Sequence, residues 1–403
     1  MIKKLTLLFH DIWEVINDIW HSPFSWVLIL TLAWVFRVSA VPADNGGIAK
    51  MVQVGSIFAL LYICSKNMKN AFLVGWKEGN TALKWMMAYL LLGVISTLWS
   101  YMPQFSFFLS VEKIIMLSVI FMLFYQTEDF FSAERAMVLS LTGLLVFEAF
   151  AWRTYAGMSF FTHSLTNGAC AAMLISYCSG EWLSDKTNNE ERRNMFKSVI
   201  VISTILLISS TSGGANACAV FGVGLALFFS GNIMWASLLL LIGIVLYLNQ
   251  DMIDDLLFFI MPGKTQESLT TATGRTSIWE LIELYGNQKP LFGWGYAAIE
   301  RYISDRDFPL TDVHNNWYGA YGGTGIVGAI LLVAHQASQI WINFVQRLNL
   351  GYTGLLCATC CATLNGYSYG YLSGKACTIT LFYFVLIVAT VFFSQLNMAD
   401  DEQ

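Results

Sequence analysis

The chain has 403 residues, of which 22 are Lys or Arg and 27 are Asp or Glu, so charged residues make up only 12% while hydrophobic residues make up 56%. Soluble domains carry about 25% charged residues, and this composition cannot supply the polar surface that a soluble globular protein needs. The net charge of −5, without a long basic run, also excludes a nucleic-acid-binding protein. The predicted fold class is therefore an all-α, polytopic integral membrane protein.

Apolar runs along the chain predict about twelve transmembrane helices, because a helix needs about 20 mostly apolar residues to cross a bilayer. Transmembrane helices 1–9 fall in residues 25–249 and helices 10–12 in residues 314–395. The expected spans are 25–41, 50–65, 81–99, 105–125, 135–152, 157–180, 196–211, 212–230, 232–249, 314–345, 351–371 and 375–395. A re-entrant pair stays open as an alternative near residue 211 and for the glycine-interrupted span 351–371.

The ends of the chain and the positions of Lys and Arg set the predicted topology. Residues 1–24 carry a helical stripe of apolar residues among acidic ones, which predicts an amphipathic segment on the membrane surface. Positive residues concentrate in the segments that are inside when the N-terminus is inside, as the positive-inside rule requires. Residues 250–313 are then a long extracytoplasmic loop with a short helix, and residues 396–403 are a cytoplasmic tail.

Two patterns resemble cofactor motifs but are better explained without a cofactor. Cys357 and Cys360 form a Cys-x-x-Cys pair, which lies in an apolar run with neither a second pair nor a nearby His. The Gly293-x-Gly295-x-x-Ala298 turn has no strand before it and faces away from cytosolic nucleotides. We therefore assign no metal and no nucleotide cofactor to these two motifs.

Arg275 lies where a turn in the outer loop leads into a predicted helix. Ser277 and Glu280 have the spacing of a capping box, and Gly286 ends the helical pattern. A guanidinium beside the free N–H groups of a helix start is a strong site for a phosphate or carboxylate. An alternative of equal weight is that Arg275 pairs with Glu280, Glu283 or an Asp of the same loop.

His314 lies at the outer edge of the membrane, where the loop meets the next span. A neutral imidazole there can accept a proton near neutral pH, which makes His314 a candidate catalytic residue. The alternative is a helix cap or a water-facing polar residue. Asp312 can orient the imidazole only if the segment is not yet helical, because residues two apart do not share a helix face.

Lys113 lies less than halfway into a predicted span that begins at the outer face. Charged residues inside a membrane are costly and often functional, so Lys113 is a candidate for binding an anionic head group. Pairing with Glu112, or snorkelling to the interface, explains the residue at least equally well.

Several short motifs occur in a fixed order around the long outer loop. They are Trp99-Ser-x-x-Pro103, Phe161-Thr-His-x-x-x-Asn167-Gly168, Thr273-Gly-Arg-Thr-x-Ile-Trp279, Pro290-Leu-x-Gly-x-Gly295 and Asp312-Val-His314-Asn315. Together with the twelve spans, this order resembles the O-antigen ligase and polymerase superfamily. The resemblance covers residues 85 to 345, and its strongest parts are Gly-Arg-Thr-x-Ile-Trp and the later His-Asn.

This resemblance implies an all-helical glycosyltransferase of the bacterial inner (cytoplasmic) membrane, with its active site facing the periplasm or exterior. It implies a donor glycan attached to undecaprenyl diphosphate within the membrane lipid, and a reaction that needs neither metal nor nucleotide sugar. By the same likeness Arg275 would hold the diphosphate, and His314 would assist deprotonation of the acceptor hydroxyl or help to bind the diphosphate. Asn315, in the same His-Asn motif, would be a substrate-binding residue.

The sequence departs from the family pattern at Ser212-Gly213-Gly214, where members often carry an Arg in a Ser-Arg-Gly turn. If Gly213 occupies that position, a positive charge is lost. Lys113 would then supply a replacement charge for binding the donor.

These features favour a polymerase for exopolysaccharide, capsule or O-antigen, which transfers a growing lipid-linked chain onto the next lipid-linked repeat unit. Although residues 250–313 are the longest loop of this chain, they are short for a ligase of the superfamily. Gly213 departs from the ligase-like Arg, and the Phe161–Gly168 motif is similar to that of exopolysaccharide-production members. One alternative is a ligase that transfers the finished chain to lipid A-core or to a protein. A second alternative is a transporter of lipid-linked glycans, and a chain-length regulator is a candidate partner.

Overall fold

The computed structural model describes most of the chain from residue 79 onward. It describes residues 79–125, 130–155, 164–184, 189–210, 212–248, 275–307, 309–310 and 312–400, together with positions 55, 59, 62 and 77. The predictions for the N-terminal segment 1–24, for the span 25–41 and for most of the span 50–65 lie outside these residues, and so does the start of the Phe161–Gly168 motif. So do the predictions for residues 250–274 and for the last residues of the tail.

Every regular element of the described residues is a helix, which confirms the predicted all-α class. Three helix starts are capped by a polar side chain, since Asn80, Asn189 and Ser212 accept backbone N–H groups of the first turn. The helices are α5 (Thr81–Ile95), the short 3-10 helix η2 (Ser96–Leu98), α6 (Pro103–Tyr125), α7 (Phe130–Tyr155), α8 (Ser164–Ser184), α9 (Glu190–Ser209), α10 (Gly213–Phe229), α11 (Ile233–Leu248), α14 (Arg275–Gly286), α15 (Ile299–Ser304), α16 (Asn316–Leu350), α17 (Gly354–Asn365) and α18 (Thr378–Asp400).

Within the described ranges, three helical stretches are long and apolar enough to cross a membrane, namely Thr81–Leu98, Pro103–Phe124 and Asn316–Leu350. These stretches correspond to the predicted spans 81–99, 105–125 and 314–345. The twelve-span topology is not confirmed. The prediction of one continuous span over 351–371 is wrong, because the helix α17 has only 12 residues and extends about 18 Å. A non-helical stretch, residues 366–377, follows α17 and is called the connecting segment below.

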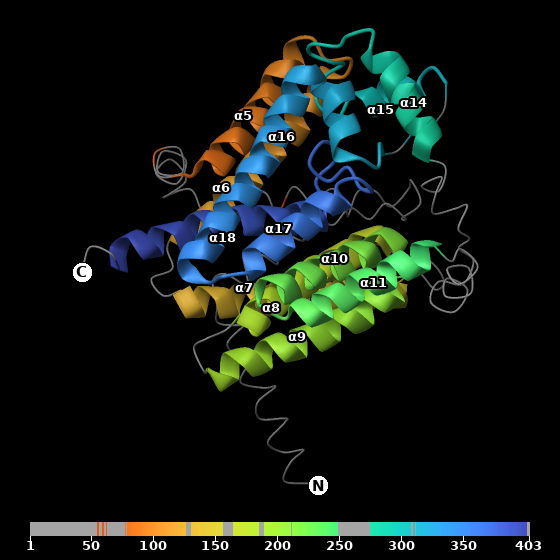
Figure 1. The fold of residues 1–403 in the computed structure, drawn as a ribbon. Coiled ribbons are helices and arrows are strands. Elements are labelled where there is room, and N and C mark those ends of the chain that lie inside the picture. Colours follow the sequence, from red (N-terminus) through yellow and green to blue (C-terminus); the bar gives the residue numbers. More distant parts are fainter. Residues whose placement is uncertain are drawn as a thin grey trace.

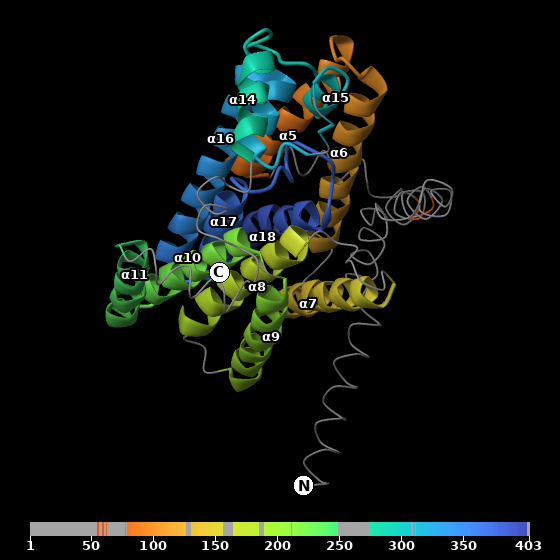
Figure 2. The same ribbon diagram turned by 90° about the vertical axis from the view of Figure 1, so that its right-hand side faces the viewer.

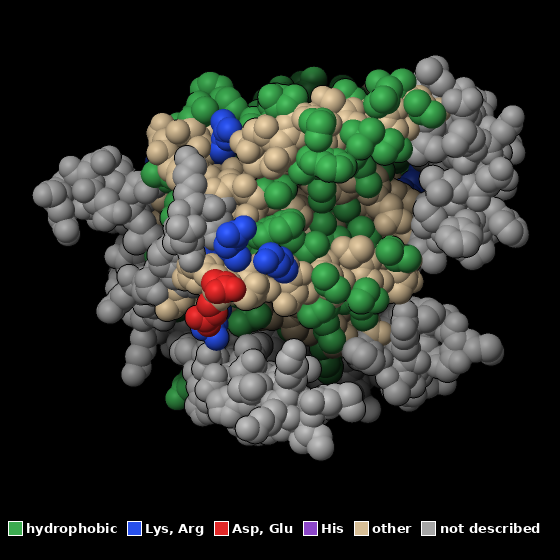
Figure 3. Space-filling view, turned by 60° about the horizontal axis from the view of Figure 1, so that its bottom comes forward, with side chains coloured by type: hydrophobic (Ala, Val, Ile, Leu, Met, Phe, Trp, Pro, Cys, Tyr) green, Lys and Arg blue, Asp and Glu red, His purple; other side chains and the backbone are tan. Residues whose placement is uncertain are grey.

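The helices form two groups that meet at the connecting segment. The steep group consists of α5, α6 and α16, and the transverse group consists of α7, α8, α9, α10 and α11. α5, α6 and α16 run side by side, and α14 and α15 lie at their upper end in Figure 1 and Figure 2. α8, α9, α10 and α11 lie below them, with α17 and α18 between. Figure 3, which looks onto the lower side of the molecule, shows hydrophobic side chains over much of that face and a small group of charged ones.

Residues 275–313 form a small core of their own, which fixes the outer loop on α16. Trp279 and Ile282 of α14 pack with Ile299 and Ile303 of α15 and with Val313. The buried positions of α14 recur at a spacing of three to four residues, as expected for a helix that packs on one face. This packing places the start of α14 beside the start of α16.

The helix α16 is interrupted at Gly325, whose φ of 69° lies in the left-handed region. The interruption frees carbonyl groups, because Gly322 and Gly323 accept the N–H groups of Trp294 and Gly295 at 3.0 and 2.7 Å. A Cβ at Gly325 would collide with the backbone of Leu291. The Pro-Leu-x-Gly-x-Gly motif of the outer loop is therefore bound to α16 by its backbone.

A buried ion-pair network joins the transverse helices at the end of α9 opposite Ser209. Arg192 of α9 donates to both Glu134 oxygens at 2.6 and 2.9 Å and to Glu181 at 2.9 Å. Glu181 in turn accepts the backbone N–H of Gly354 at 2.7 Å. One guanidinium thus links α7, α8 and α9, and through Glu181 also α17.

Candidate active site

His314 lies in a tight turn immediately before α16. The Asp312 carboxylate accepts the backbone N–H of His314 at 3.0 Å, and His314 has a φ of 55°. Positive φ is uncommon for a residue with a side chain, and such strained positions cluster at functional sites. The helix begins only at Asn316, so the segment has the non-helical form that lets Asp312 and His314 face each other.

The imidazole of His314 lies beside the second oxygen of the same carboxylate. Nδ1 of His314 is 3.6 Å from Oδ2 of Asp312, and the two side chains are 22% and 24% exposed. The ring of Tyr369, from the connecting segment, lies 6.3 Å from the imidazole between centroids. The imidazole is thus enclosed on one side and open to solvent on the other.

Asn315 is the N-cap of α16. Its side-chain oxygen accepts the N–H groups of Trp317 and Tyr318 at 2.8 and 3.0 Å, and its amide donates to the carbonyl of Tyr367 at 3.2 Å. The residue is 1% exposed. The position displays a structural role, and its predicted substrate contact stays a prediction.

Arg275 is the first residue of α14 and reaches the connecting segment. Its Nη1 donates to the carbonyl of Ser368 at 2.9 Å. Since α14 begins at Arg275, Ser277 is already inside the helix, and the predicted capping box at Ser277 is wrong. Among the described residues, the guanidinium pairs with this carbonyl rather than with Glu280 or Glu283.

The charges of Arg275 and Asp312 act on each other across the site. Burial lowers the pKa of Arg275, and the Asp312 carboxylate opposes that effect. Since the ordinary pKa of Arg exceeds 12, the side chain stays cationic at neutral pH. Asp312 therefore acts electrostatically on Arg275 and lies beside the imidazole of His314.

Lys113 lies on the buried side of the connecting segment. Its Nζ donates to the hydroxyl of Tyr296 and to the carbonyls of Leu372 and Gly374, all at 2.8 Å, and to the carbonyl of Tyr371 at 3.2 Å. The side chain is fully buried. Lys113 thus holds the connecting segment on α6, and its predicted contact with the donor stays a prediction.

The connecting segment is the part of the site that sequence reasoning missed. Residues 351–371 read as an apolar span, although Gly366, Gly370 and Gly374 at four-residue intervals were a signal of a non-helical stretch. The segment contributes the carbonyl of Ser368 and the ring of Tyr369.

Two further helix starts meet the same segment. A Cβ at Gly214, in the first turn of α10, would lie 3.2 Å from the hydroxyl oxygen of Ser368. Thr166, in the first turn of α8, donates to the Tyr369 hydroxyl at 3.5 Å. The polar turns near residues 167 and 212 that the sequence shows are therefore neighbours of the Arg275 site.

Glu300 is a buried carboxyl group behind Asp312. Burial raises its pKa to about 8, the nearby Asp312 charge adds to the increase, and Lys375 and the N–H of Val313 oppose it. Glu300 is 3% exposed. Its protonation therefore changes near neutral pH, close to the residues described above.

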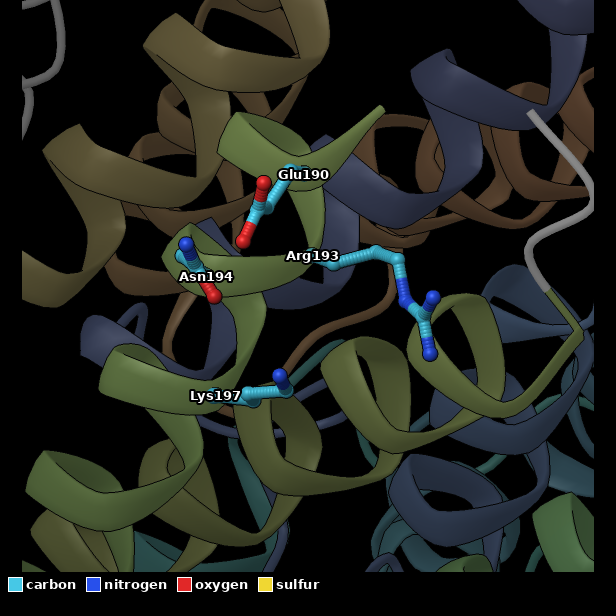
Figure 4. A pocket seen from close by; sticks show the side chains of 4 residues that line it. All are labelled: Glu190, Arg193, Asn194 and Lys197. Atoms are coloured by element: carbon cyan, nitrogen blue, oxygen red, sulfur yellow. The ribbon is translucent and has the colours of Figure 1, made fainter. Parts of the chain in front are cut away.

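An open hollow on α9 is a separate feature. Figure 4 shows the four side chains that line it, which belong to Glu190, Arg193, Asn194 and Lys197. The hollow lies at the start of α9, whereas the start of α10, which neighbours Ser368, follows the other end of α9. It is therefore not part of the Arg275 site. Among the described residues, no group of three His, Cys, Asp or Glu side chains is arranged to hold a metal ion.

Comparison with known families identifies the part of the chain that holds these residues. Residues 198–333 match the family model of the O-antigen ligases. No curated protein matches the chain. The matched range contains Arg275, Asp312 and His314 but ends before the connecting segment. This match confirms the resemblance found in the sequence, and the chain carries a domain of the O-antigen ligase and polymerase superfamily.

Proposed function

We propose that this membrane protein is a surface-polysaccharide polymerase of the bacterial inner membrane. It transfers a glycan chain from undecaprenyl diphosphate to a lipid-linked repeat unit at the outer face of that membrane. The general activity, glycosyl transfer on lipid-linked glycans, follows from the family. The observation that carries the proposal is that Arg275 and His314 reach neighbouring residues of the connecting segment, Arg275 at the carbonyl of Ser368 and His314 at the ring of Tyr369.

In the proposed reaction, the acceptor hydroxyl oxygen forms a bond to the anomeric carbon of the donor. The bond between that carbon and the diphosphate oxygen breaks, and the diphosphate leaves with the electron pair. The hydroxyl proton passes to Nε2 of His314, because Nδ1 faces Asp312. The carboxylate stabilises the resulting imidazolium, as in other His–Asp pairs.

Arg275 offsets the negative charge that grows on the departing diphosphate. A fixed cation aimed at developing charge acts mainly on the transition state. The start of α10 lies near the same place, because a Cβ at Gly214 would be 3.2 Å from the hydroxyl oxygen of Ser368. The positive end of a helix favours an anion, so this helix start supports the same task. The ammonium of Lys113 already donates to a carbonyl of the connecting segment. Lys113 therefore acts on the donor indirectly, by holding that segment in place.

The second candidate is a ligase that transfers the finished chain to lipid A-core or to a protein. The matching family carries the description O-antigen ligase, which is the reason to keep this candidate. The proposed donor site is the same in both cases, and only the acceptor differs.

The test uses the full-length protein in liposomes with undecaprenyl-diphosphate-linked repeat units, and the products are resolved by size. A ladder of lipid-linked oligomers that is lost in Arg275→Ala and in His314→Ala is the expected result. Arg301→Ala is the matched control, because Arg301 is an exposed arginine of the same outer loop. It should leave the ladder unchanged.

Other results separate the alternatives. Without a ladder, transfer of preformed chains to added lipid A-core or protein would identify a ligase. No transfer in either arrangement would direct attention to transport. A full ladder in both variants would contradict the proposed site.

A further inference from the structure

Three aromatic side chains form a rigid group beside the proposed site. The rings of Trp279 and Tyr318 are stacked, with centroids 5.3 Å apart and planes 7° apart. Tyr367 meets Trp279 edge to face at 5.0 Å and 68°. Trp279 is 6% exposed, whereas Tyr367 is 51% exposed. A buried indole therefore supports an open tyrosine ring in a fixed orientation.

Hydrogen bonds connect this aromatic group to the residues on either side of His314, and the adjacent residue Ser368 connects it to Arg275. The carbonyl of Tyr367 accepts the Asn315 amide at 3.2 Å, and Trp279 Nε1 donates to the carbonyl of Val313, also at 3.2 Å. The next residue, Ser368, holds Arg275 through its carbonyl. A ligand whose anionic group contacts Arg275 would thus have its neighbouring part over Tyr367.

The surroundings of the ring fit a hydroxylated ligand better than an acyl chain. Glu283 is exposed at the edge of the group, where the Tyr318 hydroxyl donates to its carboxylate at 2.7 Å. A carboxylate accepts hydrogen bonds from hydroxyl groups and disfavours hydrocarbon. Aromatic rings with few rotatable bonds provide contact area at a low entropy cost. The C–H face of a pyranose offers the matching apolar surface.

We propose that Tyr367, supported by Trp279, is a stacking subsite for a sugar ring of the donor glycan, next to the diphosphate that Arg275 holds. This inference rests on the proposed function and adds to it the part of the chain that contacts the sugar. The competing explanation is that Tyr367 belongs to the aromatic belt found at membrane interfaces.

The test compares the binding of two lipids to the full-length protein in nanodiscs. One is undecaprenyl diphosphate, and the other is the same lipid carrying the glycan repeat unit. Tyr367→Ala should weaken binding of the glycan-bearing lipid about fivefold, a factor in the range that aromatic contacts contribute. It should leave binding of undecaprenyl diphosphate unchanged, which also shows that the variant is folded. Tyr367→Phe should retain the native preference, because the ring is kept.

Control variants separate the two explanations. Tyr101→Ala removes another exposed aromatic ring of the outer edge, 37% exposed and in contact with Tyr302. It should leave both affinities unchanged. Arg275→Ala should weaken both lipids, because the two share the diphosphate.

Each contrary outcome has a defined meaning. If Arg275→Ala weakens both lipids but Tyr367→Ala weakens neither, or both equally, the subsite is overturned and the diphosphate site stands. If the native protein binds neither lipid, the proposed function fails, and if Arg275→Ala changes nothing, the proposed diphosphate site fails. In either case the subsite fails with it.

Discussion

Asp312 has two tasks, one for each of its oxygens. Oδ1 accepts the backbone N–H of His314 and holds that residue at its positive φ, and Oδ2 lies 3.6 Å from the imidazole. An amide in place of the carboxylate preserves the first task, because its oxygen still accepts the N–H. It removes the negative charge that the second task requires.

Asp312→Asn is therefore expected to lower the rate of glycan transfer about 100-fold, within the range that a positioned base contributes. Binding of undecaprenyl diphosphate should change little, because Arg275 is intact. The measurement is the initial rate of ladder formation, together with lipid binding. Asp305→Asn, at an exposed Asp that accepts from Tyr101, is the control. An unchanged rate in Asp312→Asn would show that the imidazole works without the carboxylate.

Glu300 predicts a pH-dependent stability. Because burial raises its pKa to about 8 from the ordinary 4.5, the folded protein retains a proton that the unfolded chain releases. The contribution of the protonated carboxyl to stability is fully present below pH 4.5 and is lost as the pH rises to about 8. Glu300→Gln cannot ionise, so its Tm should exceed the native Tm at pH 8.5, and the difference should vanish towards pH 4.5.

The matched control for this prediction is Glu280→Gln, because Glu280 is an exposed residue of the neighbouring helix α14. Its effect on the Tm should not depend on pH. A constant Tm difference for Glu300→Gln across the same range would show that Glu300 is ionised in the folded protein.

At the scale of elements, the interruption of α16 is the feature on which the outer loop depends. Gly325 provides a left-handed turn and a close approach to Leu291, and neither is compatible with a side chain. Gly351 also has a left-handed φ, of 81°, but no atom lies within 4 Å of its Cβ position. The two glycines differ in this close approach and also in ψ, which is −166° at Gly325 and 0° at Gly351.

Gly325→Ala should destabilise the protein by about 3 kcal/mol or more, since it adds a backbone collision to the left-handed strain. Gly351→Ala should cost only about 1–2 kcal/mol, the price of the left-handed conformation alone. The comparison is made by thermal unfolding in one detergent. Equal losses of stability would show that the outer loop moves away from α16 without cost.

The sequence predicts those elements whose signals are local. The apolar span 314–345 places the start of α16 within two residues, and α14 follows from its turn and its periodic apolar residues, although the capping box shifted its start by two residues. Local signals, the apolar runs 196–211 and 212–230, also predict the two helices on either side of residue 211.

The connecting segment has no local signal of comparable strength, because long-range contacts hold it. Lys113 donates to carbonyls of the segment that lie about 260 residues later in the chain. The same Lys reads in the sequence as a candidate for binding an anion, since nothing near it in the sequence shows where its acceptors come from. Pairings of this kind are visible only after the chain has folded.

At the scale of the whole molecule, the steep and transverse helix groups meet at the connecting segment, and Arg192 holds the transverse group together at the far end of α9. Two buried carboxylates share this guanidinium. Removing one partner of a buried ion pair leaves the other charge buried without compensation, which costs far more than losing an exposed pair.

Arg192→Met should therefore destabilise the protein by about 3–5 kcal/mol. Arg135→Ala removes a nearby pair in which Arg135 and Glu191 are 41% and 76% exposed, and it should cost less than about 1 kcal/mol. Thermal unfolding at the same pH compares the two variants. Similar losses would indicate that water reaches the Arg192 network.

The matched domain and the connecting segment make separate contributions to the proposed site. Residues 198–333 contain Arg275 and His314, whereas Ser368 and Tyr367 lie more than 30 residues beyond the end of the match. If Tyr367 contacts the sugar, chemistry and sugar preference are encoded in different stretches of the gene and can evolve independently. Chimeras that exchange residues 366–377 between two members of the superfamily should then inherit their glycan preference from the donor of that segment and their reaction from the recipient.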